Sequence, residues 1–433
     1  MHLRSISQPA AVRSVAVLFA AVAVACSGGQ TPPQKTTTPP PQTDGGPVSV
    51  GDPGGQVPPG EDAGTPIDPP PVKTTLSVAS GAVVAAAVPV AATVPDGTSK
   101  VEFRLDGAVL ATVTAPPFST TWDSYSAGNG AHTIAADAIA ANGTVTPSDP
   151  VPVTVSNHIN HVFIIVMENH DWSQIKGSSS APYINQTLLA QGAHAEKYMN
   201  VPGLHPSLPN YIWLESGGNQ NVWDDGGPSS HVLNVQHLTG LLEKAGVSWK
   251  AYQEDIPGTN CPLDPVNKYF PKHNPALYFT DVNGGLNYNS TGCISHVRPY
   301  TELANDLETG KAPQYSFITP NICNDMHDNS GCQSSDAIKN GDTWLSQAVP
   351  QILGSSAYRN GGALFITWDE SEGGDVPIGL IALSPMIKPG YSNTVSYTHS
   401  STLRSIEEIF GVSPMLGGAA AATDLADLFK VFP

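Results

Sequence analysis

The sequence predicts two folded domains, a small all-β sandwich followed by a doubly wound α/β domain with a mostly parallel sheet. Short runs of alternating apolar and polar residues, separated by turn dipeptides, fill residues 74–156, which is typical of a sandwich. From residue 157 onward the apolar runs are short, β-branched and unalternated, as in strands that are buried on both faces. Stretches with helical spacing separate those runs, and strands that alternate with helices indicate a doubly wound fold.

The length and charge of the chain limit its partners. It has 433 residues, with 19 Lys and Arg against 37 Asp and Glu, and a formal net charge of −18. A typical domain has ~150 residues, so the length fits more than one folded unit. No basic block is dense enough to follow a phosphate backbone, and we therefore expect no nucleic-acid partner.

Residues 1–25 resemble a bacterial lipoprotein signal peptide. Two arginines precede an apolar run from Val15 to Ala25, which is too short to span a bilayer because a spanning helix needs ~20 residues. Small residues precede Cys26, so the resemblance implies cleavage before Cys26 and its lipidation. Ordinary secretion is the alternative. In both cases we expect an exported protein, linked to a membrane through a lipid on Cys26 or not at all.

Residues 26–73 are a linker rich in Pro, Gly and Thr, and residues 74–156 are the predicted sandwich. The linker has almost nothing to bury, so we expect an extended spacer. In the sandwich, the dipeptide Asp106-Gly107 separates two alternating runs, which predicts a hairpin, and Trp122 is a candidate for the core. The stretch VEFRLDGAVLATVTAPPFSTTWD resembles a bacterial immunoglobulin-like (Ig-like) module. We expect a spacer, or a module that binds a component of the cell surface.

Residues 157–433 are the predicted α/β domain. Strands are expected at the unalternated apolar runs, and helices at the stretches between them that have apolar residues three and four apart. The expected strands are 162–167, 315–318, 364–367 and 378–383, and the expected helices are 233–245, 344–353 and 403–410. Ligands of open α/β sheets bind beyond the carboxyl ends of the strands, so the site should lie there.

Acidic residues follow two of these strands. Glu168 and Asn169 follow the first strand, and Asp369 and Glu370 follow the strand at 364–367. Carboxylate and amide oxygens suit a hard cation such as Ca²⁺, Mg²⁺ or Mn²⁺, and without a cation the carboxylates would repel one another. The alternative is that these acids stabilise the N-termini of helices.

A serine lies at the predicted start of a helix. Ser207 precedes Pro209 and a predicted helix at 210–215. Its ordinary role would be to cap that helix. The same position places the hydroxyl beside backbone N–H groups that bind anions, which suits a nucleophile that attacks a phosphate group.

Eight motifs in the α/β region make it recognisable. In order they read IIVMENHDW, HPSLPNYIWLESG, AGVSWKAYQED, KHNPALYF, SFITPNICNDMHD, GDTWLSQAVPQIL, LFITWDE and YTHSSTLRSIEEIFG. They are spread in this order along most of residues 157–425. The region resembles the bacterial phosphoesterase family that contains acid phosphatases and phosphatidylcholine-type phospholipases C, a branch of the alkaline-phosphatase superfamily. An α/β fold of the alkaline-phosphatase-like type is therefore expected.

The resemblance implies a set of site residues. It implies that one divalent metal ion is held by Glu168, Asn169, Ser207, Asp369 and Glu370, with Ser207 also the nucleophile. It implies further catalytic or pocket roles for His205, His327 and His399, and substrate binding by His273, Asn324 and Asp325. His231 and His237 have no evident partner in the sequence, and we expect them to be ordinary surface or core residues.

The motifs favour one activity within the family. ENHDW and HPSLPNY resemble the acid phosphatases, whereas the phospholipases typically read ENRSFD and GPTDPN and carry a His-rich insert that this chain lacks. We expect metal-dependent hydrolysis of phosphate monoesters through a phosphoserine. A phospholipase C-type phosphodiesterase and a non-catalytic surface adhesin are the alternatives. The DxxxH pair of two-zinc relatives is absent, which favours one metal ion; Ca²⁺, Mg²⁺, Mn²⁺ and Zn²⁺ all remain candidates.

Four cysteines besides Cys26 allow three pairings. We favour Cys261–Cys293 and Cys323–Cys332, because the second pair closes a short loop around the Asn-Asp-His cluster that follows a strand. Export makes oxidation of these thiols expected. A cysteine metal site is less favoured, since no CxxC spacing occurs.

Overall fold

The computed structural model describes residues 72–433. The predicted signal peptide, Cys26 and all but the last two residues of the predicted linker lie outside this range. In residues 72–433, no helix has both the length and the apolar character that a membrane crossing requires. The predicted fold class is confirmed, with an all-β sandwich first in the sequence and an α/β domain after it.

The sandwich consists of two sheets with one apolar core. Trp122 is 1% exposed and packs with Val101 and Phe103 in that core. The predicted hairpin is formed by β4 and β5, and both residues of its Asp106-Gly107 turn have positive φ, which such a turn requires. One sheet has the order β1 (Thr75–Leu76), β3 (Ala87–Thr93), β6 (Ser119–Asp123). The other has the order β2 (Ala82–Val84), β9 (Val151–Val155), β7 (Gly130–Ala140), β4 (Thr98–Leu105), β5 (Ala108–Val113), and β8 (Val145–Pro147) pairs with β7.

The α/β domain is built on an eight-stranded sheet. Its five strands from β14 to β16 are parallel, whereas β17 runs antiparallel to both of its neighbours. The central strands β15, β10 and β16 are buried almost throughout, as their unalternated sequences predict. The order is β14 (Val297–Pro299), β13 (Trp249–Gln253), β15 (Tyr315–Thr319), β10 (His161–Met167), β16 (Gly362–Trp368), β17 (Leu380–Leu383), β11 (Ala193–Ala195), β18 (Ser392–Asn393), and β12 (Tyr198–Met199) pairs separately with β19 (Tyr397–Thr398).

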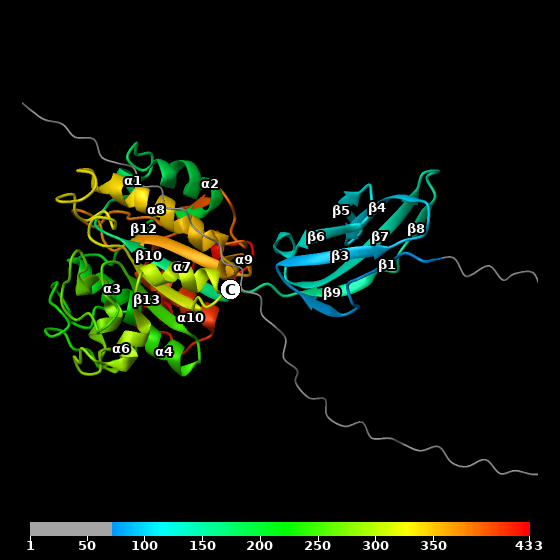
Figure 1. The fold of residues 1–433 in the computed structure, drawn as a ribbon. Coiled ribbons are helices and arrows are strands. Elements are labelled where there is room, and N and C mark those ends of the chain that lie inside the picture. Colours follow the sequence, from blue (N-terminus) through cyan, green and yellow to red (C-terminus); the bar gives the residue numbers. More distant parts are fainter. Residues whose placement is uncertain (1–71) are drawn as a thin grey trace, which may run out of the picture. The chain divides into compact units, whose positions relative to one another are not determined.

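Helices cover both faces of this sheet. In Figure 1, α8 lies on one side of the sheet, and α3, α4 and α10, which pack against one another, lie on the other. The longer helices are α3 (Ser207–Ser216), α4 (Leu238–Lys244), α6 (Thr291–His296), α7 (Thr301–Glu308), α8 (Ala337–Gly354) and α10 (His399–Phe410). The shorter ones are α1 (Trp172–Ile175), α2 (Leu189–Gln191), α5 (Thr280–Asn283), α9 (Ser356–Arg359), a π-helical turn η2 (Ile184–Leu188), and 3₁₀ turns η1 (Ser124–Ser126), η3 (Pro271–His273), η4 (Pro275–Tyr278), η5 (Gly417–Ala421) and η6 (Ala426–Leu428).

A buried histidine joins α3 to the start of α4. His237 is 2% exposed, and its ring nitrogens lie 3.0 Å from Glu215 Oε1 and 3.0 Å from Asp281 Oδ1. The ring also stacks on Phe279. The expectation that His237 has no partner is therefore wrong, because its partners come from elements far along the chain. Its expected place in the core is confirmed.

Candidate active site

The carboxyl ends of the three central strands bring the acidic residues together. Glu168 follows β10, and Asp369 follows β16, the parallel neighbour of β10. The backbone N–H of Glu168 donates to the carbonyl of Asp325, in the segment after β15, and the N–H of Asp369 donates to the carbonyl of Met167. Both carboxylates and Asp325 are completely buried. Because all three strands are parallel, their acidic ends meet at one edge of the sheet.

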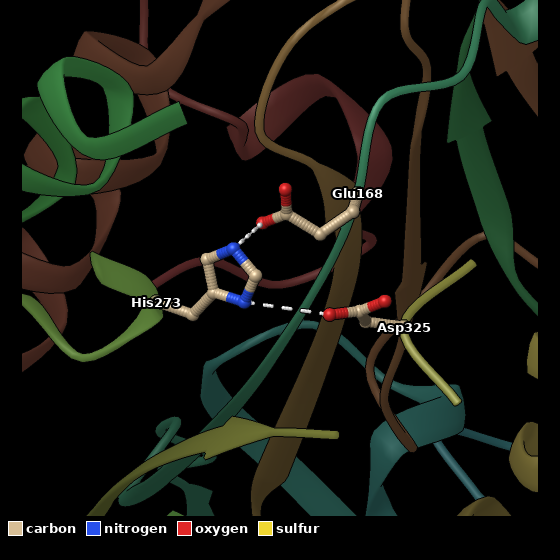
Figure 2. Close-up of side chains that lie close together, drawn as sticks. All are labelled: Glu168, His273 and Asp325. Carbon is tan, nitrogen blue, oxygen red and sulfur yellow. Dashed lines mark ion pairs between the residues drawn. The ribbon is translucent and has the colours of Figure 1, made fainter. Parts of the chain in front are cut away.

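A histidine lies between two of these carboxylates. His273 Nε2 is 3.3 Å from Glu168 Oε1, and His273 Nδ1 is 3.4 Å from Asp325 Oδ2 (Figure 2). The three side chains offer ligand atoms within 4.8 Å of one another. A cation could use one ring nitrogen only, however, and the carboxylates flank opposite nitrogens. The arrangement therefore fits a ring that Asp325 orients through Nδ1, with Nε2 directed toward Glu168 and whatever binds there.

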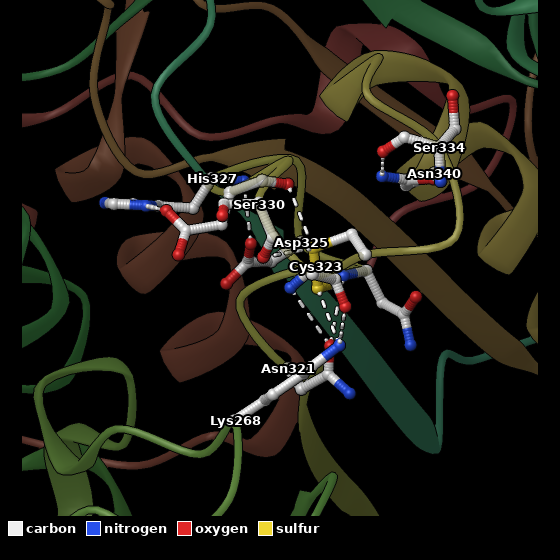
Figure 3. The surroundings of a disulfide bond; sticks show 12 residues. Lys268, Asn321, Cys323, Asp325, His327, Ser330, Ser334 and Asn340 are labelled. Carbon is white, nitrogen blue, oxygen red and sulfur yellow. Dashed lines mark hydrogen bonds and ion pairs between the residues drawn. A yellow bond between two sulfur atoms is a disulfide. The ribbon is translucent and has the colours of Figure 1, made fainter.

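A disulfide shapes the segment that carries Asp325. Both expected pairs are present, Cys261–Cys293 and Cys323–Cys332. Figure 3 shows the second bond beside Asp325 and His327. Asp325 Oδ1 accepts from the backbone N–H of His327, and Lys268 Nζ donates to the carbonyl of Gly331 within the same loop. The cross-link thus holds the loop whose residues line the carboxylate cluster.

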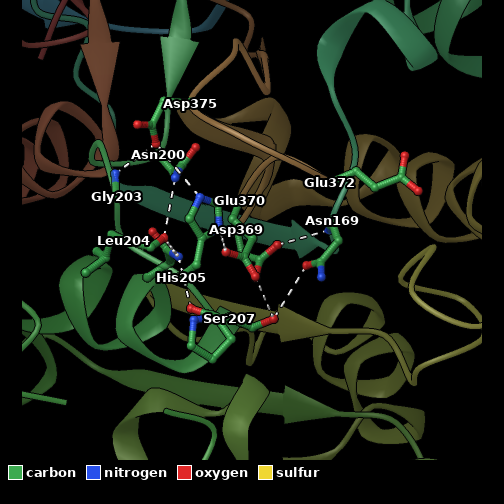
Figure 4. A network of polar contacts seen from close by, with 12 residues as sticks. Asn169, Asn200, Gly203, Leu204, His205, Ser207, Asp369, Glu370, Glu372 and Asp375 are labelled. Atoms are coloured by element: carbon green, nitrogen blue, oxygen red, sulfur yellow. Dashed lines mark hydrogen bonds and ion pairs between the residues drawn. The ribbon is translucent and has the colours of Figure 1, made fainter. Parts of the chain in front are cut away.

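Ser207 is the first residue of α3 and points into the cluster. It is 1% exposed. Its Oγ lies 2.9 Å from Glu168 Oε2, 3.4 Å from Glu370 Oε1 and 3.5 Å from Asn169 Oδ1, and Figure 4 shows it facing Asn169 and Glu370. The helix begins at Ser207 itself rather than at residue 210, because proline is well accommodated in a first helical turn. Pro206 occupies the N-cap position, so Ser207 does not cap the helix.

The donor atoms present test whether a cation fits this site. Glu168, Ser207, Asp369 and Glu370 bring buried side-chain oxygens to the same place. The Asn169 amide lies beside them: in one orientation its oxygen adds a further ligand, and in the other its nitrogen donates to Glu168 Oε2 and Asp369 Oδ1, each at 3.1 Å. The five residues Glu168, Asn169, Ser207, Asp369 and Glu370 therefore offer the oxygen-rich donor set that a hard divalent cation binds.

The electrostatics of the cluster also call for a positive partner. Burial, and then the charges of Asp369 and Asp325, raise the pKa of Glu168 well above its usual value. Burial likewise raises the pKa of Asp369 to about 6, and burial and Asp369 together raise that of Glu370 to about 9. A bound cation reverses such shifts, because it favours the ionised carboxylates.

The other predicted histidines have different surroundings. His205 is ion-paired through Nδ1 with Glu370, at the edge of the site, and its side chain is 37% exposed. His327 is 31% exposed, pairs with Asp328, and its ring centre lies 6.1 Å from that of His273. His399 is fully buried, and both of its nitrogens are engaged, by the hydroxyl of Tyr198 and the carbonyl of Asp369. His399 is therefore placed to position Asp369 rather than to meet a substrate.

Asn324 lies apart from the carboxylates. Its amide nitrogen donates to Glu254 Oε2 at 2.8 Å, and it lines a separate pocket with Tyr300 and Trp344. The geometry thus gives Asn324 no contact with Ser207, because the chain turns between residues 321 and 325 and directs the side chains of Asn324 and Asp325 differently. The alternative role of the acids as helix caps also fails for Asp369 and Glu370, since no helix follows them before β17.

Three residues of the candidate site, Tyr211, Asp225 and Lys272, were not predicted from the sequence. The hydroxyl of Tyr211 donates to Glu168 Oε1, and its ring stacks on His273 with centres 5.3 Å apart. Lys272 precedes His273 and forms an ion pair with Asp225. A signal for Tyr211 was available, because it lies four residues after Ser207 and thus on the same face of α3. Asp225 lies in an irregular segment, where no sequence pattern points to it.

Comparison with known proteins places these residues in a family. A model described as the Phosphoesterase family matches residues 186–413, and one described as a bacterial Ig domain matches residues 71–136. The chain is 30% identical over 272 residues to a phosphatidylinositol-3-phosphatase of Mycobacterium tuberculosis, covering 62% of this chain and 82% of that protein. It is also 30% identical over 257 residues to a probable acid phosphatase of Kluyveromyces lactis, covering 57% of this chain and 56% of that protein.

Among solved structures, the human ectonucleotide pyrophosphatase/phosphodiesterase 5 matches with 11% identity and a TM-score of 0.42. That match covers 63% of this chain and 100% of the human one. With respect to the two phosphatases above, the chain spans just over half the length of the Kluyveromyces lactis protein and most of the length of the Mycobacterium tuberculosis protein.

Proposed function

Since this chain belongs to the Phosphoesterase family and is a hydrolase of phosphate esters, we propose that it cleaves phosphate monoesters through a phosphoserine at Ser207. One observation carries the proposal. The hydroxyl of Ser207, at the start of a helix, lies within 3.5 Å of Glu168, Asn169 and Glu370. A serine in such surroundings has nearby groups to accept its proton and a place for a cation beside it.

We propose that Glu168, Asn169, Ser207, Asp369 and Glu370 together hold one divalent cation. When bound, that cation would neutralise phosphoryl charge and lower the pKa of the Ser207 hydroxyl. The chain's part is to supply oxygen ligands from three separate segments. The buried carboxylate oxygens gathered around Ser207 Oγ support this assignment. Ca²⁺, Mg²⁺, Mn²⁺ and Zn²⁺ are all candidates.

In the proposed reaction, Ser207 Oγ attacks phosphorus as its proton passes to Glu168 or Glu370. The bond from phosphorus to the leaving oxygen breaks, and the alcohol leaves with a proton from a general acid. We assign the acid to His327, which is 31% exposed and whose ring centre lies 6.1 Å from that of His273, because His205 is held by Glu370, one of the proposed ligands of the cation. Water then attacks the phosphoserine, its proton returns to His327, and Ser207 regains its hydrogen as phosphate leaves.

A phosphomonoester on a lipid head group is the second candidate substrate. The mycobacterial relative is named for an activity of that kind. A phospholipase C-type phosphodiesterase and a non-catalytic adhesin are weaker alternatives, and the Ser207 cluster argues against the adhesin. The two disulfides and the match to a bacterial Ig domain support an exported protein. A lipid on Cys26, and a surface ligand for the Ig-like domain, remain predictions.

The proposal is tested by assaying the purified protein on an aryl phosphate, a bis-aryl phosphodiester, a phosphoinositide monophosphate and phosphatidylcholine. We expect the monoesters to be hydrolysed fastest. Ser207→Ala should lower kcat by more than about a thousandfold, while Ser216→Ala, at the buried far end of the same helix, should stay close to the unmodified protein. Acid quenching during turnover should trap a phosphoryl group on the peptide that contains Ser207. Equal activity of both variants, or a label elsewhere, would refute the assignment.

A further inference from the structure

The start of α3 is less able to bind an anion than its position suggests. A helix N-terminus usually offers several free backbone N–H groups. Here the N–H of Leu208 donates to Asp225 Oδ1 at 3.0 Å, and Pro209 has no N–H. A phosphoryl group bound at Ser207 therefore needs positive charge from another source besides the cation.

Lys272 is linked through one carboxylate to the first turn of α3. Its Nζ is 2.9 Å from Asp225 Oδ2, and the other oxygen of the same carboxylate holds Leu208, the residue after Ser207. Lys272 also directly precedes His273, which reaches Glu168. One carboxylate thus ties the ammonium group to the first turn of the helix that carries the nucleophile.

The charge of Lys272 reaches the whole cluster. It lowers the pKa of Glu168, Asp325, Asp369 and Glu370, although other effects raise those pKa values. Burial lowers the pKa of Lys272 itself, but Glu168 and Asp225 raise it further, so the side chain stays protonated. Four carboxylates and one lysine leave three negative charges, and a divalent cation still leaves one. Without Lys272 the same count leaves two negative charges, so Lys272 halves the negative charge that repels a phosphate dianion.

The pair with Asp225 leaves Lys272 free to take another ligand. The Asp225 side chain is 33% exposed, against 17% for Lys272. Water therefore screens the carboxylate of this ion pair, and such a pair is weak. An ammonium group carries three donors on a flexible stem. It can keep Asp225 as one partner and offer another N–H to a phosphoryl oxygen.

We propose that Lys272 is a phosphate-binding residue of this site, contacting a non-bridging phosphoryl oxygen. This inference rests on the proposed phosphoesterase function. It assigns the ammonium group to recognition of the dianionic monoester, which carries more charge than a phosphodiester. Loss of Lys272 should therefore raise KM for a monoester more than for a diester.

The test measures inorganic phosphate binding by calorimetry on the full-length protein, together with hydrolysis of an aryl phosphate. Lys272→Gln should weaken phosphate binding at least about tenfold, the size expected for a lost charged hydrogen bond, and Lys272→Arg should recover most of it. Lys244→Gln, the same charge change at the exposed end of α4, should change binding less than twofold at physiological salt, where charges are screened over about 8 Å.

Asp225→Asn separates recognition from mere ion pairing. The amide oxygen can still accept from Leu208, but the competing charge is gone, so phosphate should bind as tightly as before or more tightly. That gain should disappear in the double variant with Lys272→Gln. If the ion pair is only structural, both single variants break it and both weaken binding alike. Should Lys272→Gln fail to fold, Asp225→Asn alone decides, because weaker binding there would overturn the inference.

The outcomes also separate this inference from the proposed function. Suppose that the unmodified protein hydrolyses the ester and that the folded Lys272→Gln variant binds phosphate with a Kd within twofold of that of the unmodified protein. This result would overturn the role of Lys272 and leave the proposed function intact. An unmodified protein that binds phosphate but hydrolyses no ester would refute the proposed function, and the binding data on the variants would still decide the role of Lys272. A protein that neither binds phosphate nor hydrolyses the ester would overturn both.

Discussion

The buried His237 should make the stability of the α/β domain depend on pH in the alkaline range. Burial opposes its positive charge, but hydrogen bonds and charges from Asp281 and Glu215 outweigh burial and raise its pKa to about 9, from a usual value of 6.5. A group whose pKa is higher in the folded state than in the unfolded state makes its full contribution to stability at pH values below its unfolded pKa. That contribution is lost as pH rises through the folded value. The pH window is therefore about 6.5 to 9.

The size of this effect follows from the pKa shift. One unit corresponds to about 1.4 kcal/mol, so the full shift would give about 3 kcal/mol. Asp281, one of the two partners, has a side chain that is 65% exposed, and water screens its charge. We therefore expect about 2 kcal/mol, most of it from the buried Glu215.

The assay compares the unmodified protein with His237→Gln by urea denaturation, followed by fluorescence and circular dichroism. At pH 6 the variant should be less stable by about 2 kcal/mol, and the difference should shrink toward zero by pH 10. His231→Gln, at a half-buried histidine paired with the exposed Asp224, is the matched control and should show no comparable change. A difference between His237→Gln and the unmodified protein that stays constant from pH 6 to pH 10 would show that His237 acts through packing alone.

Two further predictions concern the carboxylate cluster. Asp369→Asn should weaken binding of the proposed cation at least about tenfold, because it removes one negative charge from the ligand set. Elemental analysis after dialysis measures the metal content of the variant. The control is Asp342→Asn, at a buried acid elsewhere, which should retain the metal content of the unmodified protein. Tyr211→Phe should lower kcat about tenfold, since it frees Glu168 from its hydroxyl partner, and should cost about 1 kcal/mol of stability. Tyr252→Phe, which loses a similar bond to Asp306, should cost similar stability and leave kcat unchanged; equal losses of rate in the two variants would contradict a specific role for Tyr211.

The central strands were predictable because a strand that is buried on both faces has a continuous run of apolar residues. The runs at 162–167, 315–318 and 364–367 fall within β10, β15 and β16. The reversed direction of β17 also has a local cause, since residues 369–379 are too few for the crossover of a dozen or more residues that a parallel neighbour needs. Helix α4 begins only at Leu238, because Leu233 forms a bridge with Phe279 instead.

The acids at the strand ends were predictable for the same reason, since a parallel sheet collects them at one edge. The partners that come from irregular segments were not. Asp225 and Lys272 meet through loops whose paths depend on tertiary packing, and neither position has a periodic pattern around it. Asn324 was assigned to the site because it is next to Asp325 in the sequence. In a tight turn, however, neighbouring side chains point in different directions, and that of Asn324 contacts Glu254.

The residues of the candidate site are contributed by segments that are up to 200 positions apart, as the bond from Asn169 to Asp369 shows. No short fragment of the chain contains them all, so the binding site exists only when the whole sheet is assembled. Any ion or phosphate bound there stabilises the complete α/β domain by mass action, about 2.7 kcal/mol at a ligand concentration one hundred times Kd. Ligand-dependent thermal stability would then report on the folding of the entire domain rather than on one loop.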